Sequence, residues 1–582
     1  MNTAQLLAHF DRISEAPNAV ARLRRLVLDL AVRGKLVPQN PQDEPAPELL
    51  KRIGAERARL VEAGKVRKDK SFPDVRVDEA PFLLPLGWQW VRVRQVTSDR
   101  GQTTPFSDFT YIDVTSIDKE AGRIGKPHAI AAHTAPSRAR KVVQTGDVLY
   151  SCVRPYLLNI AVVESDISPM PIASTAFAVL NGYGLVLPRY LWLVLRSPYM
   201  VECVEERMRG QAYPAINDSD FALLPIPLPP LAEQRRIVAK MDELMAVCDR
   251  LEVARSERES RRDRLMAVSL VRLGSPPEED AADAIRAHAH FTLTNLPHLT
   301  ARPEHIKQLR QAVLDLAVRG RLAAQALGDE ISAKLLERMD AERVRLMKKG
   351  APKPKPTSAL RSNENLPDLP PGWCRVRLSD ILLGDTQNGC SAKPDDAPGG
   401  CPILRISAGT ARKDGFVAEE QHKLISGISA AQRELYRLEP GDLLACRFNG
   451  NRNFVGRLSL FADHLGLKPI YPDKLIRVRL MPGVVVPKLV KWFFDSTDVR
   501  RVVEGYCATT VGNWGISATN LKQVELPLPP LAEQRRIVAK VDELMALCDR
   551  LEACLATASE ASRGLLEAVL RDALAPALDE AA

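Results

Sequence analysis

Basic and amide side chains gather in four short polar segments of this sequence, and these segments are its first candidates for chemistry. Two follow apolar runs that begin with Gly-Asp: GDVLYSCVRPY from Gly146 and GDLLACRFNGNRN from Gly441. Two more precede proline-rich stretches: GQAYPAINDSDF from Gly210 and ATTVGNWGISATNL from Ala508. Arginine pairs bidentately with guanine, and asparagine or glutamine with adenine, so such segments suit recognition of base edges. The candidate DNA-binding residues are Arg154, Tyr156, Gln211, Tyr213, Asn217, Arg447, Asn449, Asn451, Arg452, Thr510 and Asn513.

The alternative for each of these residues is an ordinary surface loop, because loops are rich in Arg and Asn in any protein. No catalytic motif accompanies them. The sequence lacks a P-loop, a glycine-rich dinucleotide fingerprint, HExxH, GxSxG and the [DN]PP[FYW] tetrapeptide of amino-methyltransferases. We therefore expect that this chain has no catalytic site and that any chemistry belongs to another chain.

Metal and thiol chemistry are also disfavoured. His288 and His290 stand close together but have no obvious further ligands, and the ten cysteines include no CxxC pair. The segment Tyr471-Pro472-Asp473-Lys474 resembles part of a nuclease carboxylate motif but lacks the acidic-x-Lys element that should follow. We expect reduced thiols and no metal.

Composition indicates an ordinary globular protein. Of the 582 residues, 45% are hydrophobic and 26% charged, which excludes a wholly disordered or collagen-like chain. The net charge is +9 and the pI about 9.0, which makes an acidic partner such as nucleic acid plausible. The N-terminus lacks the apolar run of a signal peptide, and no long uncharged apolar stretch follows, so we expect a cytoplasmic protein without membrane contact.

The chain is a tandem repeat. PLPPLAEQRRIVAKMDELMAVCDRLE at 227–252 returns at 527–552 with 24 of 26 positions identical, and LRRLVLDLAVRGKL at 23–36 returns at 309–322 with 11 of 14 identical. A charged helical stretch and a Pro-Trp segment, LPLGW at 84–88 and LPPGW at 369–373, follow in each half. We call these repeated segments the frame. The first insert (89–224) and the second insert (374–525) show little similarity to each other, so the frame performs one task twice while the inserts recognise different things.

The repeated segment after each proline cluster predicts a long helix with a coiled-coil seam. Apolar residues recur at spacings of 4 and 3. They are Ile237, Met241, Leu244, Cys248 and Leu251 in the first helix, and Ile537, Val541, Leu544, Cys548, Leu551 and Leu555 in the second, with Leu565 and Val569 extending the register. A helix from Leu231 to about Val271 would span roughly 60 Å and could hold two domains apart. The alternative is that each helix merely packs on its own insert.

Basic residues at the start of these helices offer two equivalent surfaces for a partner protein, since two equivalent helices pack naturally about a pseudo-two-fold axis. The candidate partner-binding residues are Arg235, Arg236, Lys240, Arg535, Arg536 and Lys540. The alternative is a solvated charged face. The basic linkers at 65–70 and 348–356 fit phosphate contact but are more often solvated.

In combination, these features resemble the specificity (S) subunits of type I restriction-modification systems. The resemblance covers nearly the whole chain and rests on the doubled PLPPLAEQRRIVAK and VLDLAVRG segments, the GDVLYS and GDLLAC runs, and Trp88 and Trp373. It implies a mixed α/β (α+β) fold with two globular target recognition domains joined by two long antiparallel coiled-coil helices, related by a pseudo-two-fold internal repeat.

The resemblance also implies the division of the chain. The expected parts are an N-terminal helical segment and basic linker (1–75), target recognition domain 1 (76–226), the first long spacer helix (227–275), a central helical segment and linker (276–360), target recognition domain 2 (361–526) and the second long spacer helix (527–582). Short apolar runs bounded by Gly, Pro and Asp, such as STAFAVL from Ser174 and KLIRVRL from Lys474, predict strands within the two domains.

By resemblance, each domain reads half of a bipartite, asymmetric site in double-stranded DNA, and the helices set the spacer length, much as a dimer fixes half-site spacing. Two modification subunits would bind the frame and methylate adenine, and restriction subunits would join to translocate and cleave. This chain would hold no cofactor, with S-adenosylmethionine, ATP and Mg on the partners. Methylation would require the adenine to be flipped from the stack.

Two other functions remain as alternatives. A non-catalytic coiled-coil scaffold would bind proteins without preference among DNA sequences. A fused DNA methyltransferase or nuclease would need a cofactor-binding domain of a few hundred residues, for which the repeat and inserts leave no room. The target bases and the spacer length do not follow from the sequence.

Overall fold

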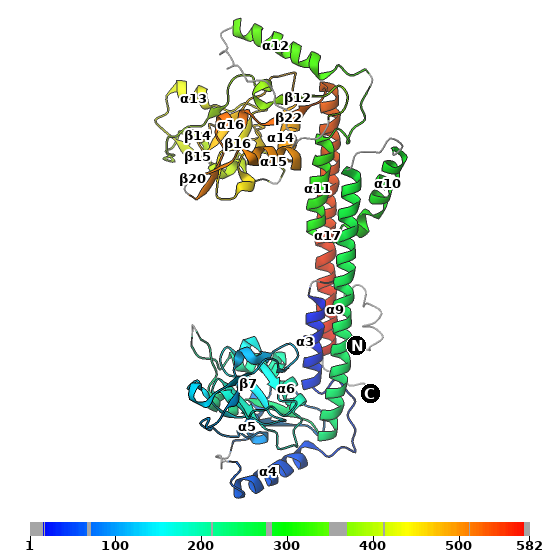
Figure 1. Ribbon diagram of the computed structural model, residues 1–582, viewed down its shortest axis with the longest axis vertical. Coiled ribbons are helices and arrows are strands. Elements are labelled where there is room, and N and C mark those ends of the chain that lie inside the picture. The colour runs from blue at the N-terminus through cyan, green and yellow to red at the C-terminus, as the bar shows by residue number, and fades with distance from the viewer. Residues whose placement is uncertain are drawn as a thin grey trace. The chain divides into compact units, whose positions relative to one another are not determined.

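The computed structural model describes residues 16, 18–66, 72–210, 213–274, 282–326, 328–348, 369–410, 412, 414–510 and 512–574. The chain divides into two compact units, Met1–Arg258 with Ala558–Ala582, and Glu259–Thr557. Each unit contains one insert. The boundaries between the units fall within two long helices, α9 (Leu231–Gly274) and α17 (Leu531–Leu574), which begin directly after the proline clusters (Figure 1). This confirms the predicted start at Leu231.

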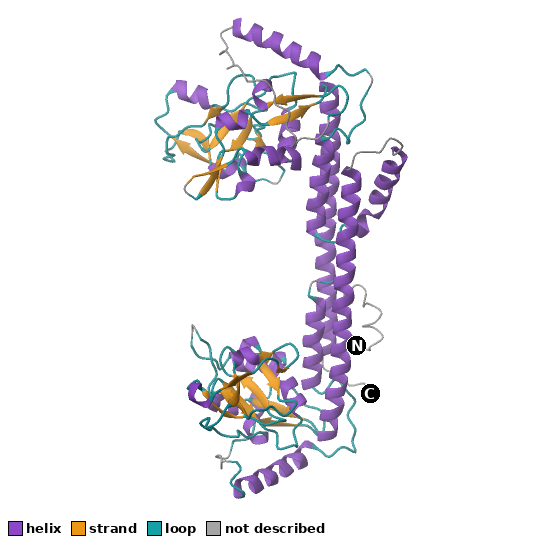
Figure 2. Cartoon of the chain, in the orientation of Figure 1, coloured by secondary structure: helices purple, strands orange, loops and turns teal. Residues whose placement is uncertain are grey.

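Strands occur within the inserts and the residues that border them, whereas the described frame consists otherwise of helices, turns and loops (Figure 2). The first unit has the helices α3 (Ala19–Val32), α4 (Ala46–Glu62), α5 (Val93–Val96), α6 (Pro188–Arg196), α7 (Pro198–Glu205) and α8 (Asp218–Ala222). Its strands are β1 (Gln89–Arg92), β2 (Phe109–Ile112), β3 (Ile117–Asp118), β4 (Arg123–Ile124), β5 (His128–Ile130), β6 (Ala139–Val142), β7 (Val148–Ser151), β8 (Ile160–Val162), β9 (Pro171–Ser174), β10 (Phe177–Leu180) and β11 (Pro225–Leu228).

Three sheets organise the first unit. Their orders are β1-β11, β10-β7-β8-β4-β3 and β5-β2-β9-β6. The apolar run after Gly146 forms β7, whose four residues are all buried, and α6 packs on β7 and β8. The largest apolar core of this unit joins these strands to α6, α7, α3 and the first turns of α9, where Ile237 and Met241 are almost fully buried.

The second unit repeats this plan with different strands. Its helices are α10 (Ala282–Leu299), α11 (Pro303–Val318), α12 (Ser332–Lys348), α13 (Ala430–Tyr436), α14 (Pro487–Asp495), α15 (Thr497–Gly505) and α16 (Ala518–Lys522). Its strands are β12 (Cys374–Arg377), β13 (Gln387–Asn388), β14 (Cys401–Leu404), β15 (His422–Ile425), β16 (Leu443–Cys446), β17 (Phe448–Asn449), β18 (Leu458–Leu460), β19 (Leu475–Val478), β20 (Ala508–Thr510), β21 (Asn513–Gly515) and β22 (Glu525–Leu528).

Four sheets form here: β12-β22, β13-β19-β16-β18, β14-β15 and β17-β21-β20. The strands predicted from the runs after Ser174, Gly441 and Lys474 are confirmed as β10, β16 and β19. The finer six-part division of the chain stays a prediction.

The repeated VRG and LPxGW segments hold each other. Gly34 and Gly320 have φ of +68° and +67°, a left-handed conformation that favours glycine. A Cβ at Gly34 would lie 2.3 Å from Cγ of Pro85, and one at Gly320 would lie 2.4 Å from Cγ of Pro370. The following tryptophans donate their indole N–H groups to the first turn of the long helices, Trp88 to Glu233 at 2.9 Å and Trp373 to Glu533 at 3.0 Å.

The glutamine of the LAEQRR motif fixes each insert onto the frame. Gln234 is fully buried, and its amide accepts from the backbone N–H of Leu187 at the start of α6 and donates to the carbonyl of Pro229. Gln534 makes the equivalent bonds to Val486, before α14, and to Pro529. Since a buried amide is costly unless it is hydrogen-bonded, these glutamines specify the position of α6 and α14 on the long helices.

Within each unit the frame helices also pack on one another. In the first unit, Val20 and Leu23 of α3 contact Cys248 of α9, and Arg24 pairs with Asp249 and Glu252. In the second unit, Arg310 of α11 pairs in the same way with Asp549 and Glu552 of α17. The predicted seam therefore serves two purposes. Its first residues, such as Ile237 and Met241, join the core of the insert, and its next ones, such as Cys248, contact the short helix α3. Among the described residues, no helix has the length and apolarity needed to cross a membrane.

Candidate nucleic-acid interface

Backbone pairing brings the two polar segments of the second insert together. Phe448 and Asn449 of β17 pair with Gly515 and Trp514 of β21, and β20 pairs with the other edge of β21. The segment that follows β16 and the segment that precedes α16 thus form one three-stranded sheet. We call residues 447–457 and 508–517, without the undescribed 511, the second recognition surface.

A chain of asparagines shapes this surface. The carboxamide oxygen of Asn449 accepts the backbone N–H of Asn451 at 2.8 Å, and that of Asn451 accepts the N–H of Asn453 at 3.0 Å. These are turns in which an Asn side chain bonds to the backbone two residues on. Asn451, Asn453 and Asn513 are exposed, and the carboxamides of Asn453 and Asn513 have no hydrogen-bond partner among the described residues. Asn453 and Asn513 therefore present free donors and acceptors to solvent.

The arginines of this surface are more strongly held. Arg447 donates to the carbonyl of Asp473 at 3.3 Å and lies over the ring of Phe448. Arg452 donates to the carbonyl of Glu504 at 2.8 Å and lies over the ring of Trp514, 4.8 Å from its centroid. Thr510 is in β20 opposite Asn513. The predicted residues of the second insert therefore gather in one place. Their guanidinium groups and the carboxamide oxygens of Asn449 and Asn451 are engaged, whereas the carboxamide of Asn513 is free.

The first insert joins its polar segments in the same way but with shorter pairing. Val153 and Arg209 each bridge to Ala215, and the N–H of Arg154 donates to the carbonyl of Pro214 at 2.8 Å. The guanidinium of Arg154 lies 4.8 Å from the centroid of the Tyr213 ring. Residues 152–158 and 209–217, without the undescribed 211 and 212, form the first recognition surface.

This first surface presents aromatic and apolar groups. Tyr213 is 69% exposed, Tyr156 43% and Leu157 40%. Arg154 and Leu158 have φ of +49° and +54° on either side of a single 3-10 turn, Pro155–Leu157. Left-handed conformations are costly for such residues, so the turn that carries Tyr156 outward is held by its surroundings.

Other predicted residues are used differently or are not described. Asn217 caps α8, since its carboxamide accepts the N–H of Asp220 at 2.7 Å and donates to the Asp220 carboxylate at 2.9 Å. Its amide therefore shapes the loop before α8. Gln211 lies outside the described residues, as do most of both basic linkers.

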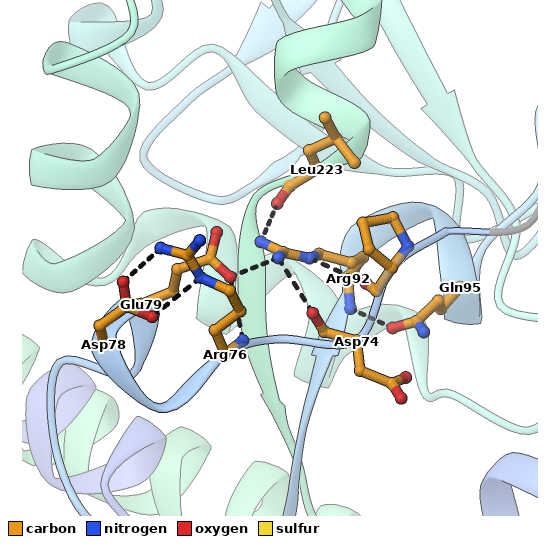
Figure 3. A network of polar contacts seen from close by, with 8 residues as sticks. Asp74, Arg76, Asp78, Glu79, Arg92, Gln95 and Leu223 are labelled. Carbon is orange, nitrogen blue, oxygen red and sulfur yellow. Dashed lines mark hydrogen bonds and ion pairs between the residues drawn. The ribbon is translucent and has the colours of Figure 1, made fainter.

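A buried arginine joins the segment before the first insert to the end of α8 (Figure 3). Arg92 is 4% exposed and donates to the carbonyl of Leu223, which directly follows α8, at 2.9 Å. It also donates to the carbonyls of Pro73 and Asp74 and to the Glu79 carboxylate. This hydrogen bond from Arg92 is the main reason that the pKa of Glu79 lies below its ordinary value. The network ties the segment before the insert to the residue that directly follows α8.

Sequence reasoning missed Asn453 and Trp514 as parts of the second surface, and Arg500 as a residue that contacts its loop. The alternation of Asn449, Asn451 and Asn453 was a usable signal, because asparagine at every second position indicates consecutive turns. For Arg500, on α15, the sequence offers no signal, since its contacts are with a distant loop.

The thiols next to these surfaces are not nucleophiles. Burial raises the pKa of Cys152 to about 12 and that of Cys446 to about 11, so both thiols are protonated at neutral pH. Across the described ranges, no group of three or more His, Cys, Asp and Glu side chains is arranged to hold a metal ion. His288 and His290 lie on α10.

The predicted partner-binding residues of the frame divide into three kinds. Arg236 pairs with Asp43 at 2.6 Å and Arg536 pairs with Asp329, so the second arginine of LAEQRR ties down a neighbouring frame loop. Lys240 and Lys540 pair with Glu243 and Glu543 within their own helices. Arg235 and Arg535 are exposed and form no ion pair with any described residue.

Comparison with known proteins decides the family. The chain is 30% identical over 577 residues to the Type I restriction enzyme EcoEI specificity subunit of Escherichia coli, with 95% of this chain and 94% of that protein covered. The chain belongs to the type I restriction enzyme specificity subunits. It is also 30% identical to the EcoAI specificity subunit of Escherichia coli, over 94% of this chain and 93% of that protein.

The family description "Type I restriction modification DNA specificity domain" matches residues 160–258 of this specificity subunit. That range includes the second polar segment of the first insert and the repeated frame segment. Among solved structures, the HsdS subunit from Thermoanaerobacter tengcongensis is 25% identical, with a TM-score of 0.46, and the match covers 86% of this chain and 99% of that chain. A structure reported for complex assembly and conformational transition of the type I R-M system gives a TM-score of 0.49 at 25% identity, with 86% and 100% covered. The identity to the two Escherichia coli specificity subunits confirms the resemblance stated from the sequence, and the role of this chain is that of a DNA specificity subunit.

Proposed function

We propose that this specificity subunit recognises a bipartite, asymmetric sequence in double-stranded DNA, with one half read by each recognition surface. The observation that carries the proposal is the common construction of the two surfaces. In both units, backbone pairing joins the loop after a buried strand to the loop before a short capped helix, and the exposed side chains at that junction differ. A shared frame with different contact groups is what two half-sites of different sequence require.

The exposed groups suggest different contacts for the two halves. The second surface offers free carboxamides from Asn453 and Asn513, which suit adenine. The first offers the Arg154 guanidinium, which suits guanine, beside exposed rings that suit thymine methyl groups or stacked bases. Residues whose atoms are already engaged, such as Asn217, act by shaping the loops.

The frame has the complementary role in this proposal. Two long antiparallel coiled-coil helices in a pseudo-two-fold arrangement would set the separation of the half-sites, and two modification subunits would bind the equivalent frame surfaces. Support comes from the repeated LAEQRR motif, in which Glu, Gln and the second Arg are used within the chain while Arg235 and Arg535 face solvent. Because Arg235 and Arg535 have no ion pair within the described chain in either copy of the motif, they suit a contact that each copy makes with a modification subunit.

Catalysis would belong to the partners. The modification subunits would methylate adenine from S-adenosylmethionine, and restriction subunits with ATP and Mg would translocate and cleave, in the cytoplasm. This specificity subunit would be non-catalytic, which is consistent with protonated thiols beside both surfaces. Its contribution would be the choice of sequence and the geometry of the complex.

Single substitutions test the division of labour. We expect Tyr213→Ala and Arg154→Ala to relax one half of the methylated motif, and Asn453→Ala and Asn513→Ala to relax only the other half. Loss of a base contact costs about 1 to 3 kcal/mol of discrimination. The measurement is adenine methylation across the genome of cells that express each variant with the modification subunit. Asn40→Ala, at an exposed position between α3 and α4, serves as the control. An unchanged motif in all four variants, or relaxation of both halves by any one, argues against the proposal.

A further inference from the structure

One arginine of the second insert makes contacts that base recognition alone does not explain. Arg500 lies on α15, and its side chain is only 11% exposed. It donates from Nη2 to the carbonyls of Arg452, at 3.0 Å, and Val455, both in the loop 447–457. Its Nε bonds to the Glu504 carboxylate at 3.1 Å. The α15 helix is thus hydrogen-bonded to the loop 447–457 through the Arg500 guanidinium, whose planar group can donate to several acceptors at once.

The loop returns the contact. Arg452 donates from Nη2 to the backbone carbonyl of Glu504, near the end of α15, at 2.8 Å. On its other side the same guanidinium lies over Trp514 of β21. Trp514 is paired with Asn449, the first residue of the asparagine chain. Each arginine therefore reaches across to the backbone of the segment that carries the other.

We propose that Arg452 and Arg500 form a reciprocal clamp that fixes the shape of the second recognition surface, and that both are positioning residues for base selection rather than base contacts. This inference rests on the proposed function. The clamp holds the loop between Asn449 and Arg457, so the free carboxamide of Asn453 keeps one direction relative to Asn513. Discrimination between bases needs such fixed donors and acceptors.

Charge and burial support a dedicated role. Taking a cation out of water is costly unless its donors are used, and burial lowers the pKa of Arg500 below its ordinary value. Around it stand Arg452 and Arg457, also cationic, against the carboxylate of Glu504. Such an arrangement stabilises the fold less than a packed apolar contact would, so its benefit lies in the geometry that it imposes.

The first insert shows that the fold does not require the clamp. The helices α7 and α15 both follow a serine at the N-cap position, Ser197 and Ser496. This correspondence places Val201 where the second insert has Arg500. In the first insert α7 packs on the turn Pro155–Leu157, and Leu158 lies against the apolar core. An apolar support thus holds the first surface, and an arginine pair holds the second.

The test compares base selection by the whole complex of this chain with its modification subunits. Duplexes with a randomised site are methylated and sequenced for the wild type and for Arg500→Ala, Arg500→Lys, Arg452→Ala and the double variant Arg452→Ala/Arg500→Ala. We expect each single alanine variant to lower discrimination about tenfold at the same positions of one half-site, and the double variant to lower it no further. Lysine should not restore selection, because one ammonium lacks the planar fork.

Selection at the half-site that the first insert reads serves as the internal control. Val201→Ala, at the corresponding position of the first insert, is the matched variant that should leave selection at the half-site read by the second insert unchanged. Unchanged base selection in Arg500→Ala overturns the clamp. The clamp is also wrong if the double variant lowers discrimination by the product of the two single effects. A third contrary result is that Arg452→Ala alone loses discrimination, and only at a single base pair. Arg500→Ala could lower the melting temperature and reduce base selection at both half-sites. In that case Arg500→Lys and Arg452→Ala test the clamp, because each keeps part of the hydrogen bonding between α15 and the loop. The proposed function fails separately, if Asn453→Ala and Asn513→Ala leave both half-sites unchanged.

Discussion

At the scale of single residues, the same motif acts differently in the two units. Asp315, in the second VLDLAVRG segment, accepts the backbone N–H of Thr497 at 2.7 Å and its hydroxyl at 2.8 Å. Asp29 is its counterpart in the first segment, but Pro198 stands where Thr497 would donate. The Oδ1 atom of Asp29 is buried and has no hydrogen-bond partner among the described residues. Identical frame residues therefore stabilise one insert and cost free energy in the other.

This contrast predicts opposite effects of one substitution. Burial raises the pKa of Asp29, so the stability that it contributes is present below its unfolded pKa and is lost as pH rises through the raised pKa. Asp29→Asn should therefore raise the melting temperature at pH 7.5, by the equivalent of about 1 kcal/mol, and change little near pH 4. Asp315→Asn should lower it, because an acceptor of two helix-start donors is weakened. Circular dichroism melts at both pH values measure this, and equal effects of the two variants would refute the account.

The sequence predicted the types of side chain at the recognition surfaces but not which atoms remain free. Arg452 and Asn217 were predicted as base contacts from type and position, yet the first is held by Glu504 and Trp514 and the second caps α8. Asn453 was not predicted, although its carboxamide is free. For Arg452 the reason is physical, since hydrogen bonds to distant backbone carbonyls decide which donors are used, and these partners lie about 50 residues away in the chain.

At the scale of elements, the frame is a set of close backbone contacts. The left-handed glycines Gly34 and Gly320 allow Pro85 and Pro370 to approach, and this places Trp88 and Trp373 against the start of α9 and α17. The helix starts and the buried strands β7 and β16 were predictable, because periodicity and proline are local signals. The pairing of β17 with β21 was not, since it joins residues more than 60 positions apart and only tertiary packing sets its register.

Substitution of three glycines tests this description. Gly34→Ala and Gly320→Ala should each destabilise the chain by about 2 kcal/mol or more, from the left-handed φ and the contact with proline. Gly54 lies within α4, and a Cβ added there would meet no other atom, so Gly54→Ala should stabilise by about 0.5 to 1 kcal/mol. Urea titration of the three variants measures the differences. Equal costs at all three positions would contradict the role given to Gly34 and Gly320.

At the scale of the whole molecule, one frame occurs twice and carries two unlike inserts. Each unit has its own apolar core, which extends from the insert into the first turns of the long helix that follows. An insert is thus bound to its frame by a repeated set of contacts, through Trp88, Glu233 and Gln234 in one unit and Trp373, Glu533 and Gln534 in the other. Because these contacts are the same, the identity of an insert can change while its attachment stays constant.

The most direct test of the central claim is to replace the second insert, residues 374–525, by the corresponding insert of another specificity subunit. The methylated motif is then sequenced in cells that also express the modification subunit. We predict a two-part motif in which one half and the spacer length are retained and the other half is new. A motif that changes in both halves, or that stays the same, would contradict the assignment of one half-site to each insert.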